Sequence, residues 1–187
     1  KLLYDVHVQM GGSVLTLFTN RRDMERLYEA LEPRLSEQGL NLACQERSSS
    51  ARRVREKFLA EKNLSLFALK SFWEGFDAAG DTLRCVVIPK LPFASPNEPL
   101  VKEREAREDR AWWRYSLPEA VIATKQAAGR LIRSAEDKGV LVLADSRLVS
   151  KRYGSSFLKS LPNKNYQRVC TKDISEPIAK WREEHDA

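Results

Sequence analysis

Short apolar runs alternate along this chain with longer amphipathic segments, and this alternation constrains the fold more than any other feature. The expected strands are residues 13–18, 40–44, 64–70, 85–91 and 139–145. The expected helices are residues 21–35, 51–59, a long one from about residue 117, and 176–184 near the end. Thr19 and Asn20 are good cap residues for the first of these helices. Runs that are apolar at every position are typical of strands buried on both faces, and helices between them supply the crossovers. The pattern predicts an α/β fold with a mainly parallel sheet flanked by helices.

Size and charge set the class of protein and of partner. With 187 residues, the chain suits one domain large enough to bury a core, and we treat residues 1–187 as that domain. Its net charge of +6 and pI of about 9.3 favour an anionic partner, nucleic acid first. The chain begins at Lys1, near a strand-like segment and without a methionine, so we expect it to be part of a longer protein.

The cysteines and histidines point away from disulfide and metal chemistry. Cys44, Cys85 and Cys170 are scattered and include no CxxC pair, which fits a reducing cytosol. His7 and His185 lie near opposite ends of the chain, so no metal site is predicted. No apolar stretch approaches the length of a membrane span, and no membrane partner is expected.

Loops that leave the carboxyl ends of parallel strands are where functional groups collect in open sheets. The loops to search are residues 19–22, 45–50, 70–81, 90–99 and 145–150. We therefore expect the functional residues of this chain to gather at one edge of its sheet.

The segment QAAGRLIR, residues 126–133, carries polar groups on one side of the long helix. Ser116 to Glu119 form a capping-box pattern, which predicts the start of that helix. At about 100° per residue, Gln126, Arg130 and Arg133 fall on one stripe, opposite the apolar residues. Such a stripe is a solvated face in most helices. Arginine forks suit phosphate oxygens, however, and a small residue such as Gly129 lets a ligand or backbone approach closely.

A second group of functional residue types follows the third expected strand, in KSFWEGFDAAGDTL at residues 70–83. Three aromatic residues flank Glu74, Gly75 and Asp77 there. Core packing accounts for one or two of the aromatics and a turn accounts for the glycines. Aromatic rings can also stack on bases, and carboxylates can hold ribose hydroxyls or metal-bound water, so both interpretations stay open.

Several of these segments, in this order, resemble the second motor domain of superfamily-two helicases, and specifically the DinG and XPD-like group. Residues 12–27 resemble motif IV of that group, residues 70–83 resemble motif V, and QAAGRLIR matches motif VI at each of its fixed positions. Residues 86–99 and 153–162 are also similar to this group. The resemblance implies a three-layer RecA-like domain of the P-loop NTPase type, in an ATP-dependent DNA helicase. It also implies a bacterial cytoplasmic protein associated with the nucleoid.

The resemblance also implies roles for individual residues. Gln126, Arg130 and Arg133 would be catalytic, with Arg133 the arginine finger that reaches ATP held with Mg²⁺ by the first motor domain. The residues implied to line the nucleotide are Glu74, Gly75, Asp77 and Gly129. The residues implied to contact single-stranded DNA, or forked and duplex substrates, are Thr19, Asn20, Arg21, Lys70, Ser71 and Trp73.

The chain lacks other parts of such a helicase. It contains no GxxxxGK[ST] loop, no acidic DExH-like motif and no four-cysteine segment for an iron–sulfur cluster, all of which the group places in the first motor domain and its insertions. We therefore expect the isolated chain to be inactive as an ATPase. The alternative is a non-catalytic domain of the same fold that binds nucleic acid or protein. The charged segment at residues 102–110 is expected to be a solvated helix or a lip of the DNA path.

Overall fold

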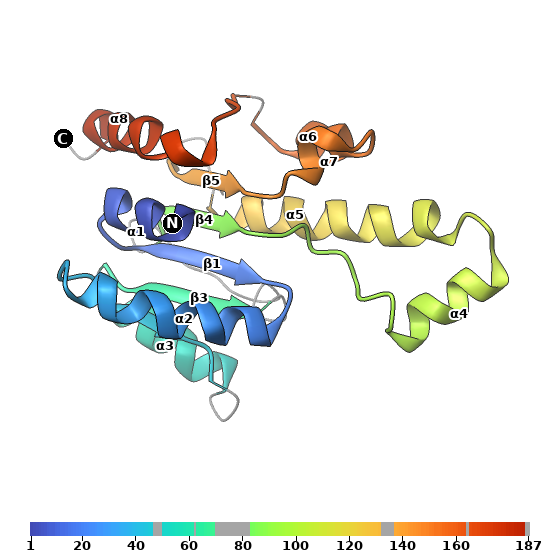
Figure 1. Ribbon diagram of the computed structural model, residues 1–187, viewed down its shortest axis with the longest axis horizontal. Helices are drawn as coiled ribbons and strands as arrows, with labels where there is room; N and C mark the ends of the chain where they lie inside the picture. Colours follow the sequence, from blue (N-terminus) through green and yellow to red (C-terminus); the bar gives the residue numbers. More distant parts are fainter. Residues whose placement is uncertain (47–49, 62, 70–82, 132–136, 164, 186–187) are drawn as a thin grey trace.

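The computed structural model describes residues 1–46, 50–61, 63–69, 83–131, 137–163 and 165–185 (Figure 1). Its centre is a five-stranded sheet in the order β2-β3-β1-β4-β5, with every neighbouring pair parallel. The strands are β1 (Val14–Phe18), β2 (Leu42–Cys44), β3 (Ser65–Leu69), β4 (Cys85–Ile88) and β5 (Val140–Leu143). The predicted parallel sheet is confirmed, and each predicted strand is present within the predicted range.

Helices cover both faces of the sheet and give the fold three layers (Figure 1). One face packs against α3 (Ala51–Ala60) and α5 (Leu117–Leu131), in a core that includes Phe58, Ala127 and Leu131. The other face packs against α1 (Leu2–Met10), α2 (Arg21–Ser36) and α8 (Ser175–His185), in a second core that includes Met24 and Ile178. Strand residues point alternately into the two cores, so the strands are apolar on both sides as their composition predicts.

Helix α1 was not predicted, because no helix or strand was assigned to the residues before the first expected strand. The structure forms nine helical residues that bury Leu3, Val6 and Met10, and the helix ends at Gly11 in the left-handed conformation. Gly12 follows with φ of 104°, and a Cβ there would lie 2.1 Å from the carbonyl oxygen of Asn63. Only glycine fits this approach, which lets the chain turn directly from α1 into β1.

The long helix begins earlier than the capping-box pattern predicts. A π-helix, η3 (Trp112–Ser116), runs directly into α5, and the N–H of Leu117 donates to the carbonyl oxygen of Trp112 five residues before it. Pro118 has no N–H and cannot bond the carbonyl of Arg114, so a wider turn fits this point of the helix. Ser116 therefore lies inside a helix, and its predicted role as a cap is wrong.

The connection from β4 to α5 carries α4 (Pro99–Arg107) away from the sheet, and Figure 1 shows α4 beyond the carboxyl ends of the strands. The charged segment is helical as expected over α4, but the helix stops before η3. After β5, α6 (Arg147–Ser150) and α7 (Gly154–Ser160) pack near the start of α5, in a third core that includes Leu91, Leu148 and Phe157. A short η4 (Thr171–Asp173) precedes α8.

Cys44, Cys85 and the buried His7 serve packing, whereas Cys170 is exposed. Cys85 is fully buried and Cys44 half-buried, and burial raises the pKa of the Cys44 thiol to about 11. His7 lies in the core, where its ring contacts the Thr16 hydroxyl at 3.2 Å, and burial lowers its pKa to about 3. Among the helices that the structure describes, none combines the length and apolarity needed to cross a membrane.

Candidate functional site at the carboxyl edge of the sheet

Four described loops leave the sheet at its carboxyl edge, as the parallel topology requires. They begin at Thr19 after β1, Gln45 after β2, Pro89 after β4 and Ala144 after β5. The loop that follows β3, from Lys70 onward, lies outside the described residues. Because β1 and β4 are neighbours in the sheet, the loops after them come together although they are about seventy residues apart in sequence.

The turn between β1 and α2 places two of the predicted nucleic-acid contacts in solvent. Thr19 and Asn20 are both exposed. Asn20 is the N-cap of α2, and its Oδ1 accepts hydrogen bonds from the N–H groups of Arg22 at 2.8 Å and Asp23 at 3.3 Å. The sequence predicted this cap. The Asn20 side chain therefore caps α2, and its hydrogen bonds fix the first helical turn next to the loop that follows β1.

Arg21, the third predicted contact on this loop, ties the turn to the next strand. Its Nη1 donates to the carbonyl oxygen of Gln45 at 3.0 Å and lies 3.5 Å from a carboxylate oxygen of Glu25. Gln45 in turn accepts a hydrogen bond at Oε1 from the N–H of Leu69 at 2.9 Å. The ends of β2 and β3 and the start of α2 are thereby joined through polar contacts.

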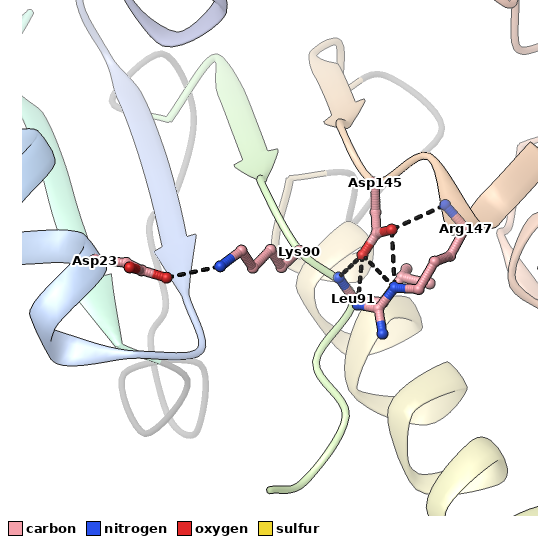
Figure 2. Close-up of polar contacts among 5 residues, drawn as sticks. All are labelled: Asp23, Lys90, Leu91, Asp145 and Arg147. Carbon is pink, nitrogen blue, oxygen red and sulfur yellow. Dashed lines mark hydrogen bonds and ion pairs between the residues drawn. The ribbon is translucent and has the colours of Figure 1, made fainter.

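A hollow of about 100 Å³ lies between the start of α2 and the end of β4. On its wall, Lys90 Nζ donates to Asp23 Oδ2 at 2.7 Å (Figure 2). This hydrogen bond lowers the pKa of the Asp23 carboxyl below its usual value, so the carboxylate stays charged at neutral pH. The hollow is lined by Phe18, Thr19, Asn20, Asp23, Arg26, Leu27, Pro89 and Lys90.

Asp145 joins the loops after β4 and β5 through four hydrogen-bonding groups (Figure 2). Its carboxylate accepts from the N–H of Leu91 at 2.8 Å, from the N–H of Arg147 at 2.9 Å, and from Nε and Nη2 of the Arg147 guanidinium, the last at 2.6 Å. Burial alone raises the pKa of Asp145, but the hydrogen bonds from Arg147 and the two N–H groups outweigh it and lower the pKa. Arg147 is consequently held as a fixed cation.

The Arg147 guanidinium lies over an aromatic cluster formed by Phe93, Trp112, Trp113, Tyr153 and Phe157. It is 5.2 Å from the centre of the Phe93 ring, and Phe93 stacks on Trp112 at 5.4 Å. Trp112 also contacts Tyr153 at 5.0 Å and Trp113 at 5.1 Å. Trp113 is 56% exposed, whereas Phe157 is fully buried. The aromatic cluster is therefore anchored in the third core and presents one indole ring to solvent.

Basic residues lie close in sequence to the exposed ring and to the ring that it contacts. Arg110 is three residues before Trp113, and Lys151 and Arg152 directly precede Tyr153, whose ring centre lies 6.5 Å from that of Trp113; all three basic residues are exposed. Arg114 is paired with Glu108 at 2.9 Å. An exposed aromatic ring with exposed cations on the same segments is the surface type that binds single strands, with the ring on a base and the cations near phosphates.

Motif VI lies on a different part of the molecule. Gln126 and Gly129 are exposed on the outer side of α5, while Ala127 and Ala128 are buried beneath it. A Cβ added at Gly129 would meet no atom within 4 Å. Arg130 belongs to α5 by its backbone, but its side chain and all of Arg133 lie outside the described residues.

The expectation that the functional residues gather at one edge of the sheet does not hold for Gln126 and Gly129, the predicted motif VI residues whose side-chain positions the structure describes. Helix α5 packs along a sheet face, and its last residue, Leu131, reaches Gly139 just before the amino end of β5. Gln126 and Gly129 therefore lie beside the sheet and point away from it. The structure separates this surface, which we call the α5 face, from the carboxyl edge that carries Thr19, Asn20 and Arg21.

The remaining predicted residues fall outside the described part of the chain. They are Lys70, Ser71, Trp73, Glu74, Gly75 and Asp77. Their assigned roles stay predictions.

Sequence reasoning did not select Lys90, Asp145, Arg147 or Trp113 as site residues, although three of them lie on loops that the sheet pattern marked for searching. Their pairing depends on the strand order, which places the ends of β1, β4 and β5 next to one another. A signal was present at the last loop, because an acid and an arginine two residues apart directly follow a buried strand. Within the described residues, no three His, Cys, Asp or Glu side chains converge to hold a metal ion.

Comparison with known proteins identifies the family. A model of the helicase C-terminal domain matches residues 3–164. The ATP-dependent DNA helicase YoaA of Escherichia coli is 48% identical over 134 residues, which cover 70% of this chain and 20% of that protein. The 3'-5' exonuclease DinG of Bacillus subtilis is 33% identical over 175 residues, which cover 91% of this chain and 19% of that protein. The chain spans about a fifth of the length of these curated relatives.

Solved structures support the fold. Dbp5 of S. cerevisiae, in a complex with RNA and ADP BeF3, matches 97% of this chain and 41% of its own, with a TM-score of 0.60 and 18% identity. Xpd4 of S. tokodaii matches 80% of this chain and 30% of its own, with a TM-score of 0.51 and 18% identity. At this identity the likeness concerns the fold, and it confirms the predicted RecA-like architecture.

Proposed function

Because the chain belongs to the helicase C-terminal domain family, we propose that it is the second motor domain of an ATP-dependent DNA helicase of the DinG and XPD-like group. The observation that carries the proposal is the match over residues 3–164, together with the exposure of Gln126 and Gly129 of motif VI on α5. In this role the chain supplies one wall of a nucleotide site and part of a single-stranded DNA path. ATP hydrolysis by the complete protein drives translocation along the strand and unwinding of the duplex.

The α5 face is the proposed wall of the nucleotide site. Gln126 is exposed there, and the open space at Gly129 allows another backbone or a phosphate to approach the helix. In the proposal, Arg130 and Arg133 point at the nucleotide phosphates, and Gln126 positions the attacking water. ATP with Mg²⁺ would be held by the first motor domain of the same polypeptide, and a guanidinium stabilises the charge that develops during phosphoryl transfer. Glu74, Gly75 and Asp77 complete this wall in the proposal.

The carboxyl edge is the proposed DNA surface. Thr19 and Asn20 are exposed at a fixed helix start, and Lys90 and Arg147 place two cations on the neighbouring loops. Trp113 offers a ring on which a base can stack. With Arg21, Lys70, Ser71 and Trp73 from the family resemblance, this edge forms a path that follows the strand. A surface of this kind binds phosphates and rings without reading sequence.

The two surfaces together suggest how the motor couples hydrolysis to movement. Nucleotide binding at the α5 face draws the two motor domains together, and hydrolysis releases them. A strand held at the carboxyl edge moves with this domain at each closure. Neither surface completes an ATPase alone, so the isolated chain is proposed to be inactive in hydrolysis.

Replacement of Arg133 by alanine in the full-length protein tests the proposal. Loss of an arginine finger should lower DNA-stimulated ATP hydrolysis by about a thousandfold or more. Binding of single-stranded DNA should persist, because the carboxyl edge is unchanged. The matched control is Arg52→Ala, which removes an arginine from the exposed side of α3 and should leave turnover unchanged. Unchanged turnover in Arg133→Ala would favour the alternative, a non-catalytic nucleic-acid-binding domain.

A further inference from the structure

The Asp23–Lys90 pair lies on the carboxyl edge, the proposed DNA surface. Both side chains line the hollow between α2 and the end of β4, together with the exposed Thr19 and Asn20. The Lys90 side chain is 63% exposed and that of Asp23 is 29% exposed, with their charged atoms 2.7 Å apart (Figure 2). The ammonium group thus reaches across from one loop to the first turn of the neighbouring helix.

Stability does not account for this pair. An exposed lysine–carboxylate pair in water adds little to folding, because solvent screens the charges and ordering of the long side chain offsets the attraction. The solvent exposure and the flexible lysine side chain also make it easy for Lys90 to leave Asp23 for another anion. A lysine binds phosphate as a point charge and can turn toward it without a fixed geometry.

The other groups facing the hollow leave few alternatives for binding a phosphate. The N–H groups of Arg22 and Asp23 already donate to Asn20 Oδ1, so the start of α2 does not offer them to a ligand. The cations that remain at the wall are Lys90 and Arg26. Asp23 is the acid there, and it neutralises the lysine that is best placed to serve the phosphate.

We propose that Asp23 is a gate on the DNA path: it holds Lys90 when the path is empty, and an incoming backbone phosphate takes Lys90 from it. This rests on the proposed function, because it requires single-stranded DNA at the carboxyl edge. In this arrangement Asp23 lowers the affinity for DNA in two ways. It competes for Lys90, and its own charge repels the phosphate. A motor that must release its strand at each step gains from such an opposing charge.

The test uses full-length protein with Asp23→Asn, Lys90→Gln and the double variant, and a single-stranded oligonucleotide as the probe. Affinity is measured across a series of salt concentrations. Asp23→Asn should bind several-fold more tightly than wild type. Lys90→Gln should bind more weakly and reduce the slope of log affinity against log salt by about 0.7, the value for one single-strand phosphate. In the Lys90→Gln background, the gain from Asp23→Asn should shrink, because the two residues act through one contact.

Matched controls come from the C-terminal end of α3, at the opposite edge of the sheet. Lys57 and Glu61 are exposed there, so Glu61→Gln and Lys57→Gln make the same changes in net charge away from the carboxyl edge. These variants should leave the salt slope unchanged. Thermal unfolding of all variants separates a change in binding from a change in folding.

Two results would overturn the gate. One is a salt slope in Lys90→Gln equal to that of wild type, and the other is an affinity in Asp23→Asn equal to that of Glu61→Gln. Either result leaves the proposed function standing, provided that wild-type protein binds the oligonucleotide. Failure of the wild type to bind would instead overturn both the proposed function and the gate.

Discussion

The carboxyl edge and the α5 face hold their polar side chains in different ways. At the edge, Asp145 fixes Arg147 with several hydrogen bonds, and Arg21 and Lys90 each have a protein partner. On the α5 face, Gln126 has no hydrogen bond within the described part of the chain, and Gly129 faces open space. One surface is organised by the chain itself. The α5 face has the residue types of a nucleotide-binding surface, but within the described residues no other part of the chain faces it. This is expected for a wall that another domain completes.

Replacement of Gly129 by alanine probes the α5 face with the largest expected effect. No atom of this chain would meet the new methyl group, and alanine favours a helix over glycine, so the free energy of unfolding should rise by about 0.5 to 1 kcal/mol. In the full-length protein the methyl group would hold the partner away from the helix. A misplacement near 1 Å should lower ATP turnover by about 100-fold.

The matched control for that variant is Ala106→Gly, the reverse exchange at an exposed position of α4. It should lower stability and leave ATP turnover unchanged. Normal ATP turnover in Gly129→Ala would show that no other domain approaches the α5 face closely. It would contradict the interpretation of the α5 face as a wall that another domain completes.

Replacement of Asp145 by alanine tests whether the carboxyl edge is organised from within. The change leaves Arg147 and the N–H of Leu91 without their acceptor, so the free energy of unfolding should fall by about 2 kcal/mol. Single-stranded DNA should also bind more weakly, because Arg147 loses its orientation. Urea denaturation measures the first effect and fluorescence anisotropy the second. Asp109→Ala, at an exposed acid of the same charge, should be close to neutral in both.

Replacement of Trp113 by alanine separates the exposed ring from the aromatic cluster beneath it. Because the side chain is 56% exposed, stability should change little. Loss of one stacking platform should weaken single-stranded DNA binding by about 1 to 2 kcal/mol, or roughly tenfold. Tyr166→Ala removes an aromatic ring of similar exposure from the C-terminal segment and should leave binding unchanged. Equal losses in the two variants would show that the aromatic cluster is not a specific platform.

The pH dependence of stability gives the smallest effect. The hydrogen bonds from Arg147 and Leu91 keep the pKa of Asp145 below its ordinary value in the folded state. The stabilisation is therefore complete above the unfolded pKa, near 4, and is lost as pH falls through the lower folded pKa. Since Arg147 is partly exposed, we expect a contribution of about 1 kcal/mol or less. Denaturation of wild type and Asp145→Asn between pH 7 and 3 should show the two stabilities converging in acid; a constant difference would contradict this origin.

Much of the fold followed from the sequence because its signals are local. The strands are apolar on both faces, and Asn20 caps α2 where the sequence placed it. Helix α1 was missed, since its short length and mostly apolar composition resemble a strand and its burial depends on α8 and the sheet. The π-helix before Leu117 was missed because the capping-box pattern depends only on Ser116 to Glu119. It carries no information on whether the residues before Ser116 are helical.

The site was predicted less completely than the fold because its residues meet through topology. Lys90 and Asp23 are far apart in sequence and come together only because β4 lies beside β1. In the same way, the N–H of Leu91 reaches Asp145 only because β5 lies beside β4. Motif VI was found because its residues are contiguous in the sequence, yet the position of Gln126 and Gly129 beside the sheet required knowledge of how α5 packs.

The central claim is that this chain carries a DNA-binding edge of its own and only half of a nucleotide site. The most direct test measures both activities on residues 1–187 alone, with a single-stranded oligonucleotide and with ATP. We predict salt-dependent binding of the oligonucleotide and no ATP turnover, with or without DNA. Clear ATP turnover by the isolated chain, or folded protein that fails to bind the oligonucleotide at low salt, would contradict the claim.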